Sequence, residues 1–245
     1  MTLLTSRPQP LVIVGAGGFA RETVETVRAI NAVAPKWELL GFVDDNPDLK
    51  GSEIQGLPVL GPVAMVQDFD DFSVVVCTGR PDNYFSRKKL VKRLDLPLSR
   101  YATVVHPTAS LAPSTSVGRG TVILAGVVVT ASVHIGRHVV VMPGAVFTHD
   151  DHLANFVTVA SGVRLGGGVR VGEGAYLGSG VLVRESRKIG SWALVGMGAV
   201  VTKDIPRHEV WVGVPARKIS DMEVPADIGA PRRRQRVSGI THRGS

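Results

Sequence analysis

A strict six-residue repeat of large apolar residues runs through the second half of this 245-residue chain. A six-residue period is typical of a parallel β-helix, in which each short strand points one side chain inward before the chain turns. The repeat therefore predicts the architecture of residues 109–201. Sixteen consecutive positions share the frame: Leu111, Val117, Ile123, Val129, Ile135, Val141, Phe147, Leu153, Val159, Leu165, Val171, Leu177, Val183, Ile189, Val195 and Val201.

The repeat also predicts how the strands stack. Three hexapeptides make one triangular coil, so residues 109–201 predict about five coils stacked roughly 4.8 Å apart, the spacing of neighbouring strands. We expect glycines to occupy the corners with positive φ, which glycine adopts without a Cβ clash. Seven of them directly follow a frame residue: Gly118, Gly136, Gly166, Gly172, Gly178, Gly190 and Gly196.

The first hundred residues follow a different pattern, in which apolar strands alternate with helices. This order is typical of a small doubly wound α/β domain. The predicted strands are 11–14, 37–43 and 73–78, and the predicted helices are about 19–31 and a stretch that ends near Arg93.

A glycine-rich turn follows the first predicted strand. The pattern Gly15-x-Gly17-x-x-Ala20 fits the dinucleotide fingerprint, and Asp44 lies downstream where it would meet a ribose hydroxyl. Only about 95 residues precede the repeat, which suffices for one mononucleotide-binding half. We therefore predict a nucleotide diphosphate site at a helix N-terminus, with NAD binding or a ligand-free turn as alternatives.

Composition narrows the possible partners. The net charge is +7, but five arginines lie in a tail after Pro225 (Arg232, Arg233, Arg234, Arg236 and Arg243) that we expect to be flexible. Nucleic acid is not favoured, because no aromatic interleaving or recognition motif accompanies the charge. The N-terminal residues predict no secretory signal and no stretch predicts a membrane span. The single Cys77, expected as a buried strand residue, agrees with a cytoplasmic protein.

Several motifs together resemble one family. They are Val14-Gly15-Ala16-Gly17-Gly18, Phe42-Val43-Asp44-Asp45, Val105-His106-Pro107-Thr108-Ala109 and the ending Val210-Trp211-Val212-Gly213-Val214-Pro215-Ala216-Arg217-Lys218. With the hexapeptides between them, they make the chain similar over about residues 10–219 to the bacterial sugar O- and N-acetyltransferases. That family is typified by sialic-acid O-acetyltransferase and UDP-4-amino-sugar N-acetyltransferase.

The resemblance implies an α/β half-Rossmann domain followed by a left-handed parallel β-helix. The implied limits are 1–104 for a nucleotide-sugar-binding domain, 105–219 for the acyltransferase domain and 220–245 for a basic tail. The implied co-substrate is acetyl-CoA or another acyl-CoA, the acceptor is a sugar or nucleotide sugar, and the assembly is a homotrimer. Neither nucleic acid nor a membrane is implied as a partner.

The resemblance also assigns site residues. His149 is the implied general base and Asp150 its partner; an imidazole can take a proton from an attacking amine or hydroxyl group while a carboxylate orients it. The family often has a second histidine nine residues after the base, where this chain has Thr158. The implied acyl-CoA residues are Thr158, Gly167, Ser179 and Met197. The implied nucleotide-sugar residues are Gly15, Ala16, Gly17, Asp44, Asp45 and Gly79.

No metal is predicted. His134, His138 and His152 lie near the His149 coil, which raises zinc at a subunit boundary as an alternative. The zinc enzymes of this fold are the γ-class carbonic anhydrases, and they would have no use for a nucleotide-binding unit.

The sequence thus predicts direct acyl transfer from acyl-CoA to an amino or hydroxyl group of a sugar, with His149 as base. The choice between nitrogen and oxygen stays open. The alternatives are acylation of a non-nucleotide sugar or secondary metabolite, or a non-catalytic scaffold that binds a nucleotide sugar or NAD.

Overall fold

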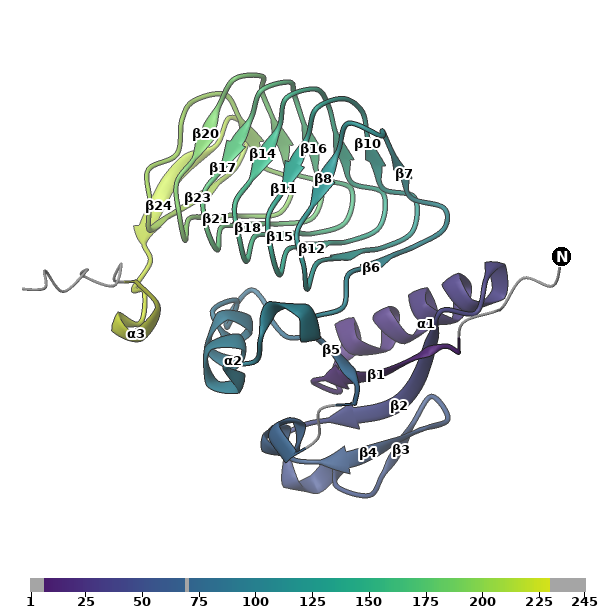
Figure 1. The fold of residues 1–245 in the computed structure, drawn as a ribbon. Coiled ribbons are helices and arrows are strands. Elements are labelled where there is room, and N and C mark those ends of the chain that lie inside the picture. The colour runs from purple at the N-terminus through teal and green to yellow at the C-terminus, as the bar shows by residue number, and fades with distance from the viewer. Residues whose placement is uncertain (1–6, 69–70, 230–245) are drawn as a thin grey trace, which may run out of the picture.

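The computed structural model describes residues 7–68 and 71–229. A five-stranded sheet with flanking helices, the N-terminal unit, lies below a triangular prism of stacked coils, and α2 lies between them (Figure 1). The order of the strands in this sheet is β3-β4-β2-β1-β5. The elements of the N-terminal unit are β1 (Gln9–Val14), α1 (Gly18–Val33), β2 (Trp37–Val43), β3 (Glu53–Ile54), β4 (Leu57–Gly61), β5 (Ser73–Val76), α2 (Ser86–Leu94) and 3₁₀ turns at Pro47–Leu49, Val63–Asp68 and Leu98–Arg100.

 The parallel β1–β2 and β1–β5 pairs place the carboxyl ends of these strands at one edge of the sheet.

The predicted elements of the N-terminal unit are confirmed with small shifts in their limits. The strand Trp37–Val43 has the predicted bounds, and α1 begins one residue earlier and ends two residues later than predicted. Ala20, Val24 and Val27 lie on one face of α1 and are fully buried, which accounts for its place against the sheet. The β3–β4 hairpin was not predicted from the sequence.

The repeat folds into a β-helix with three parallel sheets, here called faces 1, 2 and 3. Face 1 contains β7 (Ser110–Leu111), β10 (Val128–Val129), β13 (Val146–Phe147), β16 (Arg164–Leu165), β19 (Leu182–Val183) and β22 (Val200–Val201). Face 2 contains β8 (Ser116–Val117), β11 (His134–Ile135), β14 (His152–Leu153), β17 (Arg170–Val171) and β20 (Lys188–Ile189), which run side by side along the prism in Figure 1.

Face 3 joins the prism to the rest of the chain. It contains the parallel strands β6 (Val104–Val105), β9 (Val122–Ile123), β12 (Val140–Val141), β15 (Thr158–Val159), β18 (Tyr176–Leu177), β21 (Leu194–Val195) and β23 (Glu209–Val212), and it ends with β24 (Arg217–Asp221), which is antiparallel to β23. A short helix, α3 (Ala226–Gly229), follows. The predicted tail arginines, from Arg232 to Arg243, lie outside the described residues.

The frame residues form the core of the prism, as predicted. From Ile123 to Val201 every one of them is buried, and Leu111 and Val117 pack against the same core from the open first coil. Each coil pairs with the next through parallel strands, so like side chains stack on like. This stacking explains how a chain with only 5% aromatic residues fills its core.

The predicted reason for the seven frame glycines is wrong. Their φ angles are not positive; the positive values fall two residues further on, as at Gly120 and Gly174. A Cβ at Gly118 or Gly172 would instead lie 2.6 Å or 2.5 Å from the backbone of the next coil. The frame glycines are therefore required by the close approach of successive coils.

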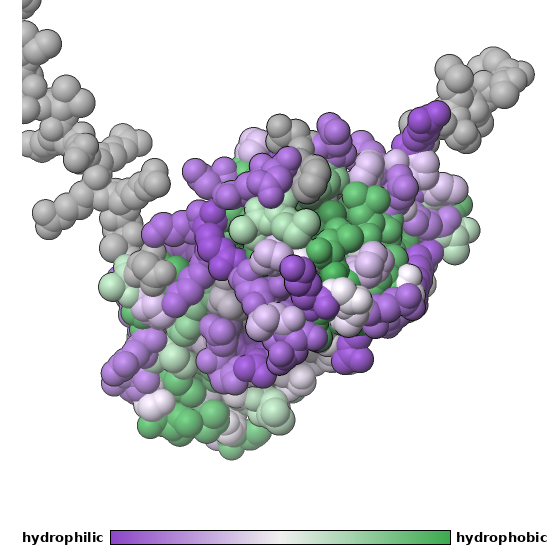
Figure 2. All heavy atoms as spheres, turned by 90° about the horizontal axis from the view of Figure 1, so that it is seen from below, coloured by the Kyte–Doolittle hydropathy of each residue, from purple (hydrophilic) through white to green (hydrophobic). Residues whose placement is uncertain are grey.

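The N-terminal unit packs on the start of face 3. Val104, Val122 and Leu124 share a buried cluster with Ala20 and Val24 of α1. Seen from below, the molecule also presents an apolar area next to hydrophilic surface (Figure 2). An apolar groove of about 460 Å³ lies in this unit, between β2, β4 and the 3₁₀ turn Val63–Asp68, and is lined by Leu40, Leu60 and Met65. Among the described residues, no helix is both long enough and apolar enough to cross a bilayer.

Candidate functional site

A cavity of about 590 Å³ lies at the carboxyl edge of the N-terminal sheet. It is lined by Gly15, Ala16, Gly17, Asp44 and Gly79, five of the six residues predicted to hold a nucleotide sugar. Parallel strands bring these residues together because the turns that follow β1, β2 and β5 meet at one edge. The structure thus assembles most of the predicted nucleotide site in one place.

The glycine-rich turn leaves backbone donors facing this cavity. Gly15 has φ +97°, and a Cβ there would lie 2.9 Å from the Thr78 methyl carbon and 3.0 Å from the Cys77 carbonyl oxygen, so only glycine fits. Gly17 is the N-cap of the 16-residue α1, and no side chain caps it. The first N–H groups of α1 and the positive end of its dipole therefore suit a phosphate.

The two aspartates after β2 have different contacts. Asp44 accepts the Ala16 N–H on Oδ2 at 2.9 Å and the Asn46 N–H on Oδ1 at 2.9 Å, so it braces the glycine-rich turn. Asp45 lies outside the cavity lining; it accepts the Val63 N–H and pairs with Arg93. Burial would raise the pKa of Asp45, but the hydrogen bonds from Arg93 and Val63 outweigh it and lower that pKa. Asp45 therefore joins the end of β2 to the 3₁₀ turn Val63–Asp68 and to α2.

Cys77 and Thr78, which follow β5, are two further residues that line this cavity. Cys77 is buried and lies 3.3 Å from the Thr23 hydroxyl, and burial raises the pKa of its thiol to about 12, so it is no nucleophile. The predicted burial is confirmed, but β5 ends at Val76, so Cys77 lies one residue beyond the strand in which it was predicted. The Thr78 hydroxyl is buried beside the cavity with no hydrogen-bond partner among the described residues.

His149 lies on the edge of the prism between faces 1 and 2, here called edge 1–2. It occupies the turn that follows β13, and its side chain is 68% exposed. Its Nδ1 lies 2.9 Å from Oδ2 of Asp150, which has φ +61°. The rest of the ring lies across Gly167 of the next coil, where a Cβ would come within 2.4 Å of Nε2. Gly167 thus makes room for the imidazole, and Nε2 is the nitrogen left for chemistry.

The other predicted acyl-CoA residues lie elsewhere on the prism. Ser179 and Met197 are exposed on the edge between faces 3 and 1 (edge 3–1), and Met197 is 81% exposed. Thr158 lies on face 3 and is buried; its hydroxyl accepts a hydrogen bond from Nη2 of Arg87 at 2.8 Å. One chain therefore does not bring His149 together with Ser179 or Met197.

Arg87 was not singled out in the sequence. It lies in the first turn of α2 but is only 1% exposed, and it donates to the carbonyls of Thr78, His138 and Phe156 as well as to Thr158. Burial lowers the pKa of Arg87 to about 10, so its guanidinium stays charged at neutral pH. This side chain connects the floor of the nucleotide cavity to the coils of the prism.

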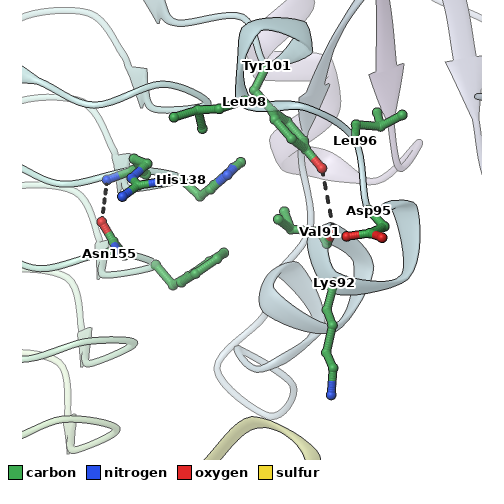
Figure 3. A pocket seen from close by; sticks show the side chains of 10 residues that line it. Val91, Lys92, Asp95, Leu96, Leu98, Tyr101, His138 and Asn155 are labelled. Carbon is green, nitrogen blue, oxygen red and sulfur yellow. Dashed lines mark hydrogen bonds between the residues drawn. The ribbon is translucent and has the colours of Figure 1, made fainter. Parts of the chain in front are cut away.

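A second cavity, of about 360 Å³, lies where α2 meets the edge between faces 2 and 3 (Figure 3). The rings of His138 and Tyr101 meet edge to face at this cavity, with centroids 4.6 Å apart, and Tyr101 directs its hydroxyl toward the Val91 carbonyl. Burial and the charges of Arg87 and Arg137 lower the pKa of His138 to about 4. His138 is therefore a neutral core residue.

The two remaining histidines of this region lie together on one face of the prism. His134 and His152 stack on face 2 with ring centroids 4.7 Å apart, and the Ser116 hydroxyl lies 2.6 Å from Nδ1 of His134. Within residues 7–68 and 71–229, no group of three or more His, Cys, Asp or Glu side chains is placed to hold a metal ion.

A glycine-rich turn at the edge of a sheet, joined to a hexapeptide β-helix with a histidine–aspartate pair on its edge, fits the class of hexapeptide-repeat acyltransferases that the sequence resembles. A family model described as the PglD N-terminal domain matches residues 10–94. No curated protein sequence matches the chain.

Solved structures extend the likeness to most of the chain. The acetyltransferase domain of PglB from Neisseria gonorrhoeae, in complex with acetyl coenzyme A, is 28% identical with a TM-score of 0.76, and the match covers 86% of this chain and 100% of that one. PerB from Caulobacter crescentus, in complex with CoA and GDP-perosamine, is 31% identical with a TM-score of 0.75 over 86% and 97% of the two chains. WeeI from Acinetobacter baumannii is 25% identical with a TM-score of 0.74 over 86% and 100%.

The chain belongs to the hexapeptide-repeat sugar acetyltransferase family of the PglD type. It is an acyl-CoA-dependent acyltransferase, its co-substrate is acetyl-CoA or another acyl-CoA, and its prism is a left-handed β-helix, as the sequence predicted.

Proposed function

We propose that this protein transfers an acetyl group from acetyl-CoA to the amine of a nucleotide-linked amino sugar, with His149 as general base. The observation that carries the proposal is the pair formed by His149 Nδ1 and Asp150 Oδ2 at 2.9 Å, which leaves Nε2 over Gly167 at the surface. Because the relative PerB was crystallised with CoA and GDP-perosamine, an amine acceptor on a nucleotide is favoured over a hydroxyl acceptor.

The nucleotide of the acceptor would bind in the cavity beside the glycine-rich turn. Its phosphates would meet the N-terminus of α1, and a base or ribose would lie toward Gly79 and Asn83. The volume of about 590 Å³ is in the range of small-molecule sites. The sugar would then extend from this cavity toward an imidazole on the prism.

Each chemical step follows from ordinary acyl transfer. As the amine nitrogen attacks the thioester carbonyl carbon, Nε2 of His149 takes a proton from that nitrogen, and a tetrahedral oxyanion forms. Asp150 stabilises the imidazolium and keeps Nδ1 protonated. The intermediate then collapses: the carbon–sulfur bond breaks, the thiolate of CoA leaves, and it accepts the proton from the imidazolium. The products are the amide and CoA.

The complete site would form between copies of the chain in a homotrimer. His149 and Gly167 lie on edge 1–2, whereas Ser179 and Met197 lie on edge 3–1. A groove that contains both sets needs edge 1–2 of one copy beside edge 3–1 of another. Face 1, which lies between these two edges, carries the exposed apolar side chains of Val128 and Leu182 and would supply the contact.

Steady-state kinetics with a thiol reagent test the base. With acetyl-CoA and a GDP- or UDP-linked amino sugar, His149→Ala should lower kcat by about 10²- to 10⁴-fold while CoA binding persists. Asp150→Asn should lower it less, because the imidazole remains. Unchanged turnover in His149→Ala would reject this role.

Subunit mixing tests the groove. His149→Ala removes the base from edge 1–2, and Met197→Arg should block edge 3–1. Each variant should be inactive alone. In mixed trimers, edge 1–2 of the Met197→Arg chain and edge 3–1 of the His149→Ala chain are both intact, so a groove between them should regain activity. If the mixture stays inactive while mixed trimers form, the site does not lie between copies.

A further inference from the structure

The turn that carries His149 departs from the regular hydrogen-bond ladder of the prism. In the two flanking coils, the N–H groups of Thr130 and Gly166 donate to the carbonyls of Phe147 and Val183 in the next coil. At the equivalent position the Thr148 N–H donates instead to Oδ2 of Asp151, at 3.0 Å. The Thr148 hydroxyl takes over the bond to the next coil and donates to the Leu165 carbonyl at 3.1 Å.

Asp151 also holds the coil on the far side of this turn. Its Oδ1 accepts the N–H of Val169 at 2.8 Å, so one carboxylate joins the start of the His149 turn to the next coil. The side chain is 1% exposed. Asp150 lies between Thr148 and Asp151 and has φ +61°, close to the +56° and +70° of Ser132 and Gly168 in the flanking coils, and its carboxylate meets His149.

A carboxylate is an unusual choice for this place in the coil. The positions 18 residues before and after Asp151, one coil away on each side, are Val133 and Val169, and both are buried. Burial raises the pKa of Asp151 to about 7, although the N–H bonds from Val169 and Thr148 oppose that shift, so the charge is costly to bury. A valine would fill this position in the stack without the free-energy cost of burying a charge. The presence of a carboxylate therefore indicates a role in the turn that carries His149.

The same bond elsewhere in the prism is made without a charge. On the edge between faces 2 and 3, the Thr121 hydroxyl oxygen accepts the Val139 N–H at 3.1 Å, which spans the same 18 residues as the bond from Val169 to Asp151. Thr121 is fully buried and lies on a different edge from His149. It is therefore a natural control, with the same structural bond and no link to the imidazole.

We propose that Asp151 is a positioning residue for the acyl transfer: its buried carboxylate re-routes the ladder at Thr148 and so directs His149 and Asp150 into their pair. It touches neither substrate nor the reacting atoms. This inference rests on the proposed role of His149 as base.

The experiment compares Asp151→Val, Asp151→Asn and Thr121→Val in the full-length protein. Asp151→Val restores the residue type of both neighbouring coils but removes both side-chain bonds. Its kcat should fall about 10- to 100-fold, as expected when a catalytic group moves by about 1 Å, with KM for acetyl-CoA unchanged within twofold. Asp151→Asn keeps one acceptor oxygen and should lie between the wild type and Asp151→Val. Thr121→Val should keep kcat within twofold.

A second readout does not depend on turnover. The ¹⁵N chemical shifts of the His149 ring report which nitrogen carries the proton. The wild type and Thr121→Val should show one tautomer, with the proton on Nδ1 toward Asp150, and Asp151→Val should show a mixture. The two proposals can fail separately. If the wild type transfers no acyl group, but the His149 ring changes from one tautomer in the wild type to a mixture in Asp151→Val, the proposed function fails and the positioning of His149 by Asp151 stands.

Other results would overturn the inference. They are a single unchanged tautomer in Asp151→Val, kcat retained within twofold in that variant, or an equal loss of kcat in Thr121→Val. Thermal unfolding of all four proteins shows whether each variant is folded at the assay temperature. Should Asp151→Val fail to fold, the comparison of Asp151→Asn with Thr121→Val decides by the same criteria.

Discussion

Gly167→Ala should move the His149 imidazole, the proposed base, without disturbing the fold. A Cβ at Gly167 would lie 2.4 Å from Nε2 and 2.5 Å from Cε1 of His149. Carbon and nitrogen atoms in contact need about 3.5 Å, so the ring must shift by about 1 Å. The φ angle of Gly167 is not in the positive range, and the His149 side chain is 68% exposed, so the ring can swing outward at little cost.

The expected loss is about 10²-fold in kcat, because a displacement of about 1 Å has an effect of this size on a positioned group. That factor corresponds to about 2.7 kcal/mol in the activation free energy. Steady-state kinetics measure kcat, and thermal unfolding should show a Tm close to that of the wild type. Binding of CoA, measured by calorimetry, separates a moved imidazole from a blocked co-substrate.

A double-mutant cycle provides the control. If Gly167→Ala acts through the imidazole, it should have almost no further effect on kcat in the His149→Ala protein. The reasoning would be refuted if Gly167→Ala kept kcat within twofold of the wild type. An equal loss in both backgrounds would also refute it.

Three further predictions concern binding, stability and pH. Gly15→Ala should abolish binding of the nucleotide part of the acceptor in calorimetry, because the new Cβ meets Thr78 and the Cys77 carbonyl at a φ of +97°. Leu177→Ala, at a fully buried frame position, should cost about 3 kcal/mol in urea unfolding; a cost below 1 kcal/mol would contradict the packed core. The pKa of His138 falls from 6.5 to about 4 on folding, so its contribution to stability is complete above pH 6.5 and is lost as the pH falls toward 4. Between pH 8 and pH 5 the wild type should lose about 2 kcal/mol more than His138→Asn in urea unfolding, and equal losses would refute this.

The prism could be predicted from the sequence because its core repeats. Each frame residue occupies the same environment one coil after another, so the pattern survives substitution of Val, Leu, Ile and Phe. The hairpin of β3 and β4 gave no such signal. Its strands are short, Pro58 interrupts the second, and the turn residues Gln55 and Gly56 have φ of +50° and +72°, a conformation that Asn-Gly signals more clearly.

The candidate site was predictable where it depends on neighbours in sequence. His149 and Asp150 are adjacent, and the glycine-rich turn is read directly from its spacing. The burial of Thr158 could not be predicted, because it depends on a contact with Arg87, which lies 71 residues away in the sequence. Arg87 itself lies beside Lys88 and Lys89 in the sequence, a run typical of a solvated helix face.

Asp151 did leave a signal in the sequence. It occupies the position two residues before a frame residue, where the neighbouring coils carry Val133 and Val169. A charged residue at a position that is apolar in both neighbouring coils breaks the repeat locally, and such a break marks a place where the coil does more than pack. Only the structure shows that the two acceptors of this carboxylate meet the N–H groups of Thr148 and Val169.

Mass spectrometry of the acceptor tests the central claim most directly. The protein is incubated with acetyl-CoA and GDP- or UDP-linked amino sugars, and the sugar product is analysed together with the released CoA. The account predicts an N-acetylated nucleotide sugar formed in step with free CoA, at a rate that falls at least about 10²-fold in His149→Ala. Release of CoA without an acetylated sugar, or equal product formation by His149→Ala, would contradict it.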